Sequence, residues 1–297
     1  MSSNMEILSR DSFAESCGGL QDYVSPSRLA LWLKCPLAFK LRYVDGIRTP
    51  PTQNLFLGKR VHDGLEFYYR HRQAGATISV KEVAEHIDRH WGDAADEERV
   101  LFKAATESEK LLAKCQDLVA CYLNRFAGFD ERVLGVELAM TTALADPVTG
   151  EVLSLPMVGV VDLLIETDDG AVLVDFKTAA RGGEPIEQQY EIQLGCYAAM
   201  YRELFGLPEA GLEIRTLVKT KQPRIEVHRF ESRSAQHFAR LFAVLHEYVA
   251  ALDRGQFNYR PGTGCMFCDM RHEHCKAWSG HLPQFQNKED LSWPKSS

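Results

Sequence analysis

Residues 158–177, which read VGVVDLLIETDDGAVLVDFK, constrain this chain most, because they form two apolar runs around a probable tight turn. Asp175 and Lys177 lie two positions apart on the second run, so their side chains point to the same face of a strand. Asp162 lies on the first run, and the Asp-Gly pair at 169–170 is typical of a hairpin turn. The segment therefore predicts two carboxylates and an ammonium group on one face of a β-hairpin.

The position of Asp162 relative to the other two side chains depends on the hairpin loop. A two-residue loop at 169–170 places Asp162 opposite Lys177, whereas a four-residue loop places it opposite Asp175. Both alternatives keep all three polar groups on one face. Burying them against an apolar sheet is costly unless they are paired or bound. One interpretation is a divalent cation held by the acids, and the other is a cross-strand ion pair between Asp162 and Lys177.

Two predicted helices carry further polar residues of interest. His62 falls on a helix whose apolar residues recur at three- and four-residue spacing, and it lies at the margin of that apolar stripe. From its position alone, it is more typical of a buried core histidine than of a ligand. Gln193 and Tyr197 are four residues apart on a helix at about 186–205 and therefore share one face. Their spacing alone is also compatible with a surface glutamine and an interface tyrosine.

Three cysteines near the carboxyl end form a compact pattern, Cys265-x2-Cys268-x6-Cys275. The C-x2-C spacing lets two thiolates face one centre. We see no secretory signal, so we expect reduced thiols in a cytoplasmic protein and metal binding rather than disulfides. His272 and His274 lie nearby in the sequence, and either would serve as the fourth ligand of a zinc site with three cysteines and one histidine.

Composition and charge narrow the class of protein. A chain of 297 residues with 45% hydrophobic content can bury a substantial core. Because no apolar run approaches membrane-spanning length, we expect no membrane association. The net charge of −7 counts against a simple nucleic-acid-binding module that relies on a basic surface. It does not count against an enzyme whose acids hold metal.

The order of predicted elements indicates an α/β fold with a central sheet. Helices are expected at about 25–44, around His62, from the capping box at 79–82, at about 97–126, 186–205 and 233–253. Strands are expected at about 132–144, 150–166, 171–178, 212–220 and 224–230. Residues 1–22 are polar and expected to be mobile, and the tail after about residue 281 is expected to be disordered.

An acid on one strand followed by D-x-K on the next resembles the PD-(D/E)xK nuclease superfamily, with Val161 in place of the proline before the first acid. Three further elements resemble its RecB-like branch in the correct order. Residues 58–62 (GKRVH) resemble the histidine motif, and Gln193 with Tyr197 resembles the Q-x3-Y motif. Cys35, together with the three clustered cysteines, resembles the iron–sulfur signature shared by AddB, exonuclease V and the CRISPR-associated RecB-like nucleases.

The resemblance implies a role for each motif residue. The implied ligands of Mg²⁺ or Mn²⁺ are His62, Asp162, Asp175 and the backbone carbonyl of Phe176. Lys177 would position or deprotonate the attacking water. Gln193 and Tyr197 would reach toward the substrate phosphate or that water.

The resemblance also implies an architecture. It predicts a restriction-endonuclease-like mixed sheet flanked by helices, as a single domain over residues 23–282 with a tail at 283–297. Within it we expect a helical lobe at about 55–127 and a nuclease core at about 130–255. A [4Fe–4S] cluster would be held by Cys35, Cys265, Cys268 and Cys275, joining the two terminal regions. Zinc is the alternative at the same cysteines.

The implied function is a metal-dependent DNA exonuclease acting on single-stranded ends, in DNA repair and recombination or in CRISPR adaptation. Its expected partners are DNA and a helicase, repair or CRISPR-adaptation protein. Two alternatives remain open at this point. One is a non-catalytic DNA-binding scaffold subunit of such a complex, and the other is a zinc-stabilised protein without nuclease activity.

Overall fold

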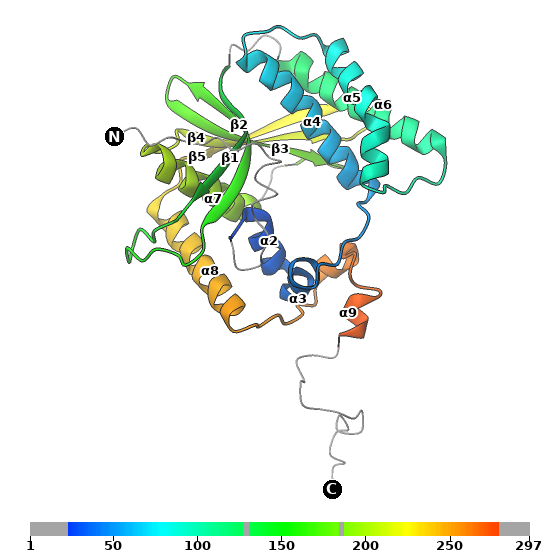
Figure 1. Ribbon diagram of the computed structural model, residues 1–297. Coiled ribbons are helices and arrows are strands. Elements are labelled where there is room, and N and C mark those ends of the chain that lie inside the picture. Colours follow the sequence, from blue (N-terminus) through cyan, green and yellow to red (C-terminus); the bar gives the residue numbers. More distant parts are fainter. Residues whose placement is uncertain (1–22, 127–130, 184–186, 279–297) are drawn as a thin grey trace.

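The computed structural model describes residues 23–126, 131–183 and 187–278 (Figure 1). Its centre is one five-stranded sheet in the order β1-β2-β3-β4-β5. The strands are β1 (Arg132–Thr142), β2 (Met157–Thr167), β3 (Gly170–Ala179), β4 (Gly211–Val218) and β5 (Arg224–Glu231). Only the β3–β4 pair is parallel, so the sheet is mixed, as predicted. The expected mobile amino-terminal segment and the expected tail lie outside the described residues.

Helices cover both faces of the sheet (Figure 1). The helices are α2 (Pro26–Lys34), α3 (Pro36–Phe39), α4 (Gln53–Gln73), α5 (Val80–Glu97), α6 (Ala105–Phe126), α7 (Glu187–Phe205), α8 (Ala235–Asp253) and α9 (His274–Ala277). One face packs against α4, α5 and α6, and the other against α2, α7 and α8. The predicted α/β fold, with a mixed sheet flanked by helices, is therefore confirmed.

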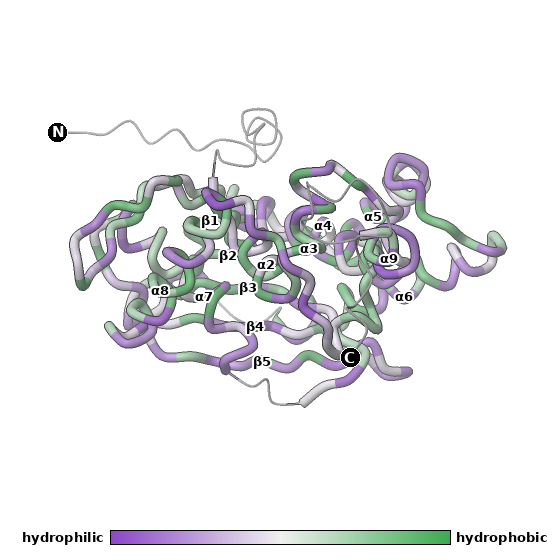
Figure 2. The backbone as a smooth tube through the Cα atoms, turned by 90° about the horizontal axis from the view of Figure 1, so that it is seen from below, coloured by the Kyte–Doolittle hydropathy of each residue, from purple (hydrophilic) through white to green (hydrophobic). Residues whose placement is uncertain are grey.

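Each face has its own hydrophobic core. Leu65 and Leu118 are fully buried in the core beneath α4 and α6, and Leu194 and Leu245 are fully buried in the core beneath α7 and α8. Burying one such side chain contributes roughly 1.5–3 kcal/mol. In Figure 2, hydrophobic and hydrophilic residues alternate along the helices around the sheet, as expected for helices with one buried face. No helix in the described part of the chain is long and apolar enough to cross a membrane.

The predicted boundaries differ from the observed ones in three places. The helical region expected at 25–44 is broken at Cys35, whose backbone is extended (φ −165°) because the next residue is a proline. It continues as α3 and a π-helical turn over Lys40–Val44. The helix expected from residue 97 begins only at Ala105, since α5 extends to Glu97. The predicted capping box of α5 is present, with Ser79 and Glu82 bonding each other's backbone N–H groups.

The third difference concerns the strand expected from residue 150, which begins at Met157. Asp146 accepts hydrogen bonds from the backbone N–H groups of Val148 and Thr149, which folds the preceding residues into a turn. The connection between β1 and β2 is therefore longer and less regular than expected. The β2–β3 hairpin, by contrast, forms within the predicted segment, although its loop consists of Asp168 and Asp169.

Candidate active site

Helix α4 brings His62 close to the sheet. The Thr52 side chain caps the helix by accepting a hydrogen bond from the Leu55 N–H. Gly58 lies one turn before His62 on the same helical face. A Cβ atom at Gly58 would lie 3.2 Å from Thr178 Oγ1 on β3, which is a tight contact. The glycine therefore allows α4 to approach β3 closely at this point.

The β2–β3 register decides between the two predicted arrangements of the acids. Thr167 pairs with Gly170, so the loop consists of Asp168 and Asp169 rather than 169–170. Since Leu163 pairs with Val174, the next position places Asp162 opposite Asp175. The observed register is therefore the one that a four-residue loop predicted. The loop itself nevertheless has two residues, because it lies one position earlier than the predicted two-residue loop.

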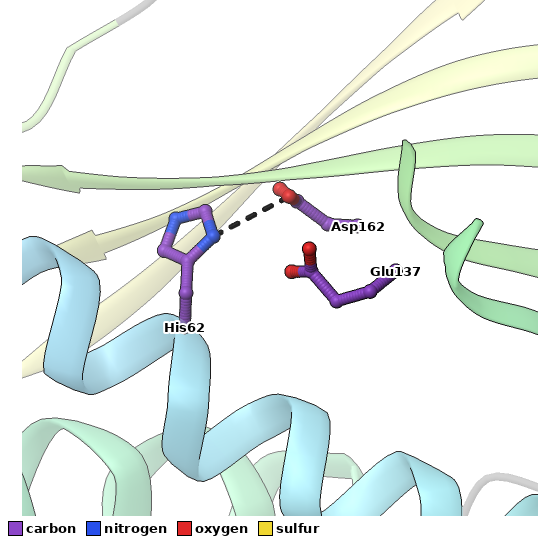
Figure 3. A group of neighbouring side chains, drawn as sticks. All are labelled: His62, Glu137 and Asp162. Carbon is purple, nitrogen blue, oxygen red and sulfur yellow. Dashed lines mark ion pairs between the residues drawn. The ribbon is translucent and has the colours of Figure 1, made fainter. Parts of the chain in front are cut away.

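Asp162 is contacted by two different elements. Its Oδ1 lies 3.4 Å from His62 Nδ1 on α4 (Figure 3). Its Oδ2 accepts a hydrogen bond of 2.7 Å from the backbone N–H of Phe176 on β3. The carboxylate therefore links the histidine helix to the strand that carries the D-x-K sequence. Lys177 is not its ion-pair partner, so the simple Asp162–Lys177 pair is not observed.

Asp175 belongs to a second set of contacts, with the helix on the other face of the sheet. Its carboxylate is almost fully buried and forms an ion pair with Lys177 Nζ at 2.5 Å. Gln193 Nε2 on α7 donates to Asp175 Oδ1 at 2.8 Å and to the Tyr197 hydroxyl at 3.0 Å. The four predicted residues Asp175, Lys177, Gln193 and Tyr197 are thus joined by direct contacts.

A residue that the sequence did not single out, Glu137 on β1, completes a possible metal-ligand group. Among the described residues, only His62, Glu137 and Asp162 form such a group, with one ligand atom from each lying within 4.8 Å of the others (Figure 3). Asp175 does not join it in this conformation. The sequence gives little indication of a role for Glu137, because it is a single acid in the middle of a mostly apolar strand. The irregular β1–β2 connection hides which residue lies opposite Asp162.

Burial and neighbouring charges shift the ionisation of these groups. Burial lowers the pKa of His62, but the charge of Asp162 and its hydrogen bond outweigh this and raise the pKa to about 9. Burial, aided by repulsion from Asp162, raises the pKa of Asp175 to about 6 despite the opposing Lys177 charge. Burial also lowers the pKa of Lys177, but the two aspartates raise it by more. Lys177 therefore remains an ammonium group at neutral pH.

A buried polar network lies behind Phe176, the residue between the acid and the lysine of the D-x-K sequence. The Arg215 side chain is 2% exposed and donates to the Tyr122 hydroxyl at 2.8 Å and to Glu131 at 2.6 Å. The Tyr69 and Tyr122 hydroxyls lie 2.7 Å apart. The Tyr69 ring stacks on the Phe176 ring at 6.1 Å, and the Tyr122 ring meets its edge at 5.4 Å. This network packs Phe176 against α4 and α6.

The four predicted cluster cysteines line one cavity of about 880 Å³ at the junction of the two terminal regions. Burial raises the pKa of the Cys275 thiol, and so do the charges of Cys35, Cys268 and Cys265. Within the described chain, no three of these sulfur atoms lie within 4.8 Å of one another. A tetrahedral zinc with bonds of about 2.3 Å would bring its sulfur ligands within roughly 4 Å of each other. The four sulfur atoms are therefore not arranged as the ligands of a single zinc ion in this conformation.

The histidines proposed for a zinc site have other neighbours. His272 Nε2 accepts a hydrogen bond of 2.7 Å from Arg271 Nε, and His274 Nε2 lies 4.0 Å from Glu273. Neither histidine forms a metal-ligand group with the cysteines in the described part of the chain.

Comparison with known families decides how this site is interpreted. The family model of the PD-(D/E)XK nuclease superfamily matches residues 23–275, which span both the acid site and the cysteine cavity. This chain belongs to the PD-(D/E)XK nuclease superfamily. Members of this superfamily are typically metal-dependent nucleases, so the acids gathered on β2 and β3 lie in a site of the kind that binds divalent metal. None of the curated proteins matches the sequence.

One solved structure shares the overall fold of this chain. A crystal structure described as a "putative exonuclease" from Eubacterium rectale aligns with a TM-score of 0.56 and 14% identity, over 97% of this chain and 99% of the other. At that identity the similarity shows the fold alone. The protein SSO0001 aligns with 13% identity over 87% of this chain and 88% of the other, but its TM-score of 0.39 is too low to carry an argument.

Proposed function

We propose that this PD-(D/E)XK protein is a metal-dependent DNA nuclease, acting as an exonuclease on single-stranded ends. The observation that carries the proposal is the convergence of side chains from opposite helical layers on the β2–β3 hairpin. His62 approaches Asp162 from α4, while Gln193 contacts Asp175 from α7. A purely structural ion pair would not need polar residues from both layers.

The residues present fit a divalent metal. His62, Asp162, Asp175 and the Phe176 carbonyl would hold one or two Mg²⁺ or Mn²⁺ ions, since carboxylate, carbonyl and imidazole groups are suitable ligands. The bound metal would lower the pKa of a coordinated water and offset charge growing on the scissile phosphate. The ammonium group of Lys177 would orient that water and stabilise the phosphate charge. The Gln193 amide and the Tyr197 hydroxyl would position the same groups.

Two observations support the choice of an exonuclease. The Eubacterium rectale structure with the same fold is described as a putative exonuclease. In the described part of the chain, the elements all pack around one sheet or beside the cysteine cavity, and no separate specificity domain accompanies them. Action on linear single strands, in repair, recombination or CRISPR adaptation with a helicase or adaptation partner in the cytoplasm, is part of this proposal.

We also propose a structural [4Fe–4S] cluster at Cys35, Cys265, Cys268 and Cys275. Support comes from the single cavity that all four cysteines line. Iron and sulfide content of anaerobically purified protein, with an absorption spectrum, tests this directly. Four irons per chain with broad visible absorption supports the cluster, whereas stoichiometric zinc without iron would overturn it.

The nuclease proposal is tested with end-labelled single-stranded, duplex and closed circular DNA in Mg²⁺ or Mn²⁺. Wild type and Asp175→Ala are compared as iron-loaded, anaerobically purified proteins. Metal-dependent loss of linear single strands by wild type alone supports the proposal, and survival of circles establishes the need for an end. Absence of cleavage by the loaded wild type would overturn it in favour of a DNA-binding scaffold subunit.

A further inference from the structure

We infer that Glu137 is a direct ligand of the divalent metal, held in place by a strained backbone at the centre of β1. This inference rests on the proposed metal-dependent activity and adds a residue that none of the recognised motifs contains. It concerns one glutamate, its backbone conformation and the two neighbouring ligands. Three structural observations support it.

The first observation is the geometry of the ligand atoms. His62, Glu137 and Asp162 come from α4, β1 and β2, and their ligand atoms lie within 4.8 Å of one another. An octahedral Mg²⁺ or Mn²⁺ has bonds of about 2.1 Å, so its ligand atoms are about 3–4 Å apart. A small contraction of the group would therefore enclose one ion. Figure 3 shows the Glu137 carboxylate beside Asp162 and facing the same space as the His62 ring.

The second observation is the backbone of Glu137, which has a positive φ of 45°. The neighbouring pairs Val136↔Leu163 and Leu138↔Val161 are intact, so this residue lies inside a paired strand rather than in a loop. A residue other than glycine in this conformation is strained and is retained where the surroundings or function require it. Among the described non-glycine residues, only Arg99 shares a positive φ, and Arg99 follows the end of a helix.

The third observation concerns the directions of the side chains on either side of Glu137 and Asp162. In a regular strand, residues two apart face the same side. Here Val136 packs in the core beneath α4–α6, whereas Leu138 packs in the core beneath α7 and α8. On the neighbouring strand β2, Leu163 packs in the core beneath α4–α6, whereas Val161 packs in the core beneath α7 and α8. Glu137 and Asp162 therefore lie where both strands cross from one helical layer to the other, which is the place that His62 reaches from α4.

These observations divide the site into two parts. His62, Glu137 and Asp162 form the group that would hold a divalent metal. Asp175, with Lys177 and Gln193, lies beside it and is engaged in direct contacts of its own. The strained backbone at Glu137 lowers the stability of the protein, and a role as metal ligand accounts for its retention.

The experiment separates the ligand role from the strain by using three substitutions in the full-length, iron-loaded protein. Glu137→Gln and Glu137→Ala remove the charge but keep a Cβ atom in the strained conformation. Glu137→Gly removes the charge and also the strain, because glycine adopts positive φ freely. Mn²⁺ affinity is measured without DNA, by calorimetry or by the electron paramagnetic resonance signal of free Mn²⁺. Thermal midpoints are measured in EDTA.

We expect all three variants to bind Mn²⁺ at least about tenfold more weakly than wild type. In EDTA we expect Glu137→Gly to melt about 2–4 °C above Glu137→Ala, although glycine in a strand normally destabilises. Arg99→Gly is the matched control, since it relieves a positive φ at an exposed residue far from the site in sequence. It should leave Mn²⁺ affinity unchanged.

Two outcomes would overturn the inference. One is wild-type Mn²⁺ affinity in Glu137→Gln and Glu137→Ala, and the other is Glu137→Gly melting below Glu137→Ala in EDTA. Neither measurement uses DNA cleavage. A protein that binds Mn²⁺ through Glu137 but degrades no DNA would therefore contradict the proposed function and leave this inference standing.

Discussion

The acid site and the cysteine cavity are built in opposite ways. The acids lie on neighbouring strands of one sheet, and hydrogen bonds hold them before any metal is present. Asp162 accepts from the Phe176 N–H, and Asp175 accepts from Gln193. The cysteines come from segments about 230 residues apart in the sequence and line a cavity with partly or fully exposed side chains. Among the described residues, their local core has only three buried members, Leu37, Leu41 and Met270.

This difference indicates which site depends on its bound group for structure. The sheet positions the acids whether or not metal is bound, so losing the metal should affect chemistry more than folding. The cavity has few apolar contacts of its own, so its bound group should supply much of the free energy that holds the chain ends together. Four predictions test this contrast.

The largest expected effect is on cleavage by Asp175→Asn. Replacing a metal-binding carboxylate with an amide should lower the rate of DNA cleavage by about 10³-fold or more. Burial raises the pKa of Asp175 to about 6, so at pH 8 the carboxylate is ionised and its buried charge lowers the stability of the folded protein. The neutral amide removes this cost, and the thermal midpoint in EDTA at pH 8 should not fall. A large drop in the midpoint would show that the acid site also supports the fold.

The second prediction concerns Cys268→Ser. Losing a ligand of a group that closes a loop of about 230 residues should cost several kcal/mol and lower the thermal midpoint by about 10 °C. Cys121→Ser is the matched control, because Cys121 is also partly buried but lies outside the cavity. Equal midpoints for the two variants would contradict the contrast between the sites.

The third prediction tests how the acid site is kept in position. Arg215→Met breaks a buried ion pair with Glu131, and Arg202→Met breaks one with the fully buried Glu209. Each should destabilise the protein by about 3–5 kcal/mol. Only Arg215→Met should also lower kcat, by about 10–100-fold at a temperature where both variants are folded, because its network packs against Phe176. Equal kcat in the two variants would limit Arg215 to a structural role.

The smallest expected effect belongs to Tyr122→Phe. This change keeps the ring against Phe176 but removes the hydroxyl that accepts from Arg215. We expect a loss of about 1 kcal/mol in the free energy of unfolding and a change in kcat of only a few fold. A loss of kcat as large as that of Arg215→Met would show that the hydroxyl, rather than the guanidinium, positions the strand.

Local sequence patterns were sufficient for the features that depend on local geometry. The two-residue alternation placed Asp175 and Lys177 together, and the four-residue spacing placed Gln193 and Tyr197 on one helical face. The Ser79 capping box correctly predicted the start of α5. Each of these features is encoded within a few residues, so the periodicity of a strand or helix is enough to predict it.

The tertiary structure decided what depends on how distant segments meet. The sequence by itself determined that a hairpin carries two acids and a lysine and that four cysteines were available as ligands. Only the fold decided that Asp162 lies opposite Asp175 and that Glu137 joins His62 and Asp162. The pairing of β1 with β2 depends on the turn at Asp146 and on the long connection between the two strands. It also depends on the positive φ of the Glu137 backbone. Such pairing depends on packing across the whole sheet, which no short sequence window contains.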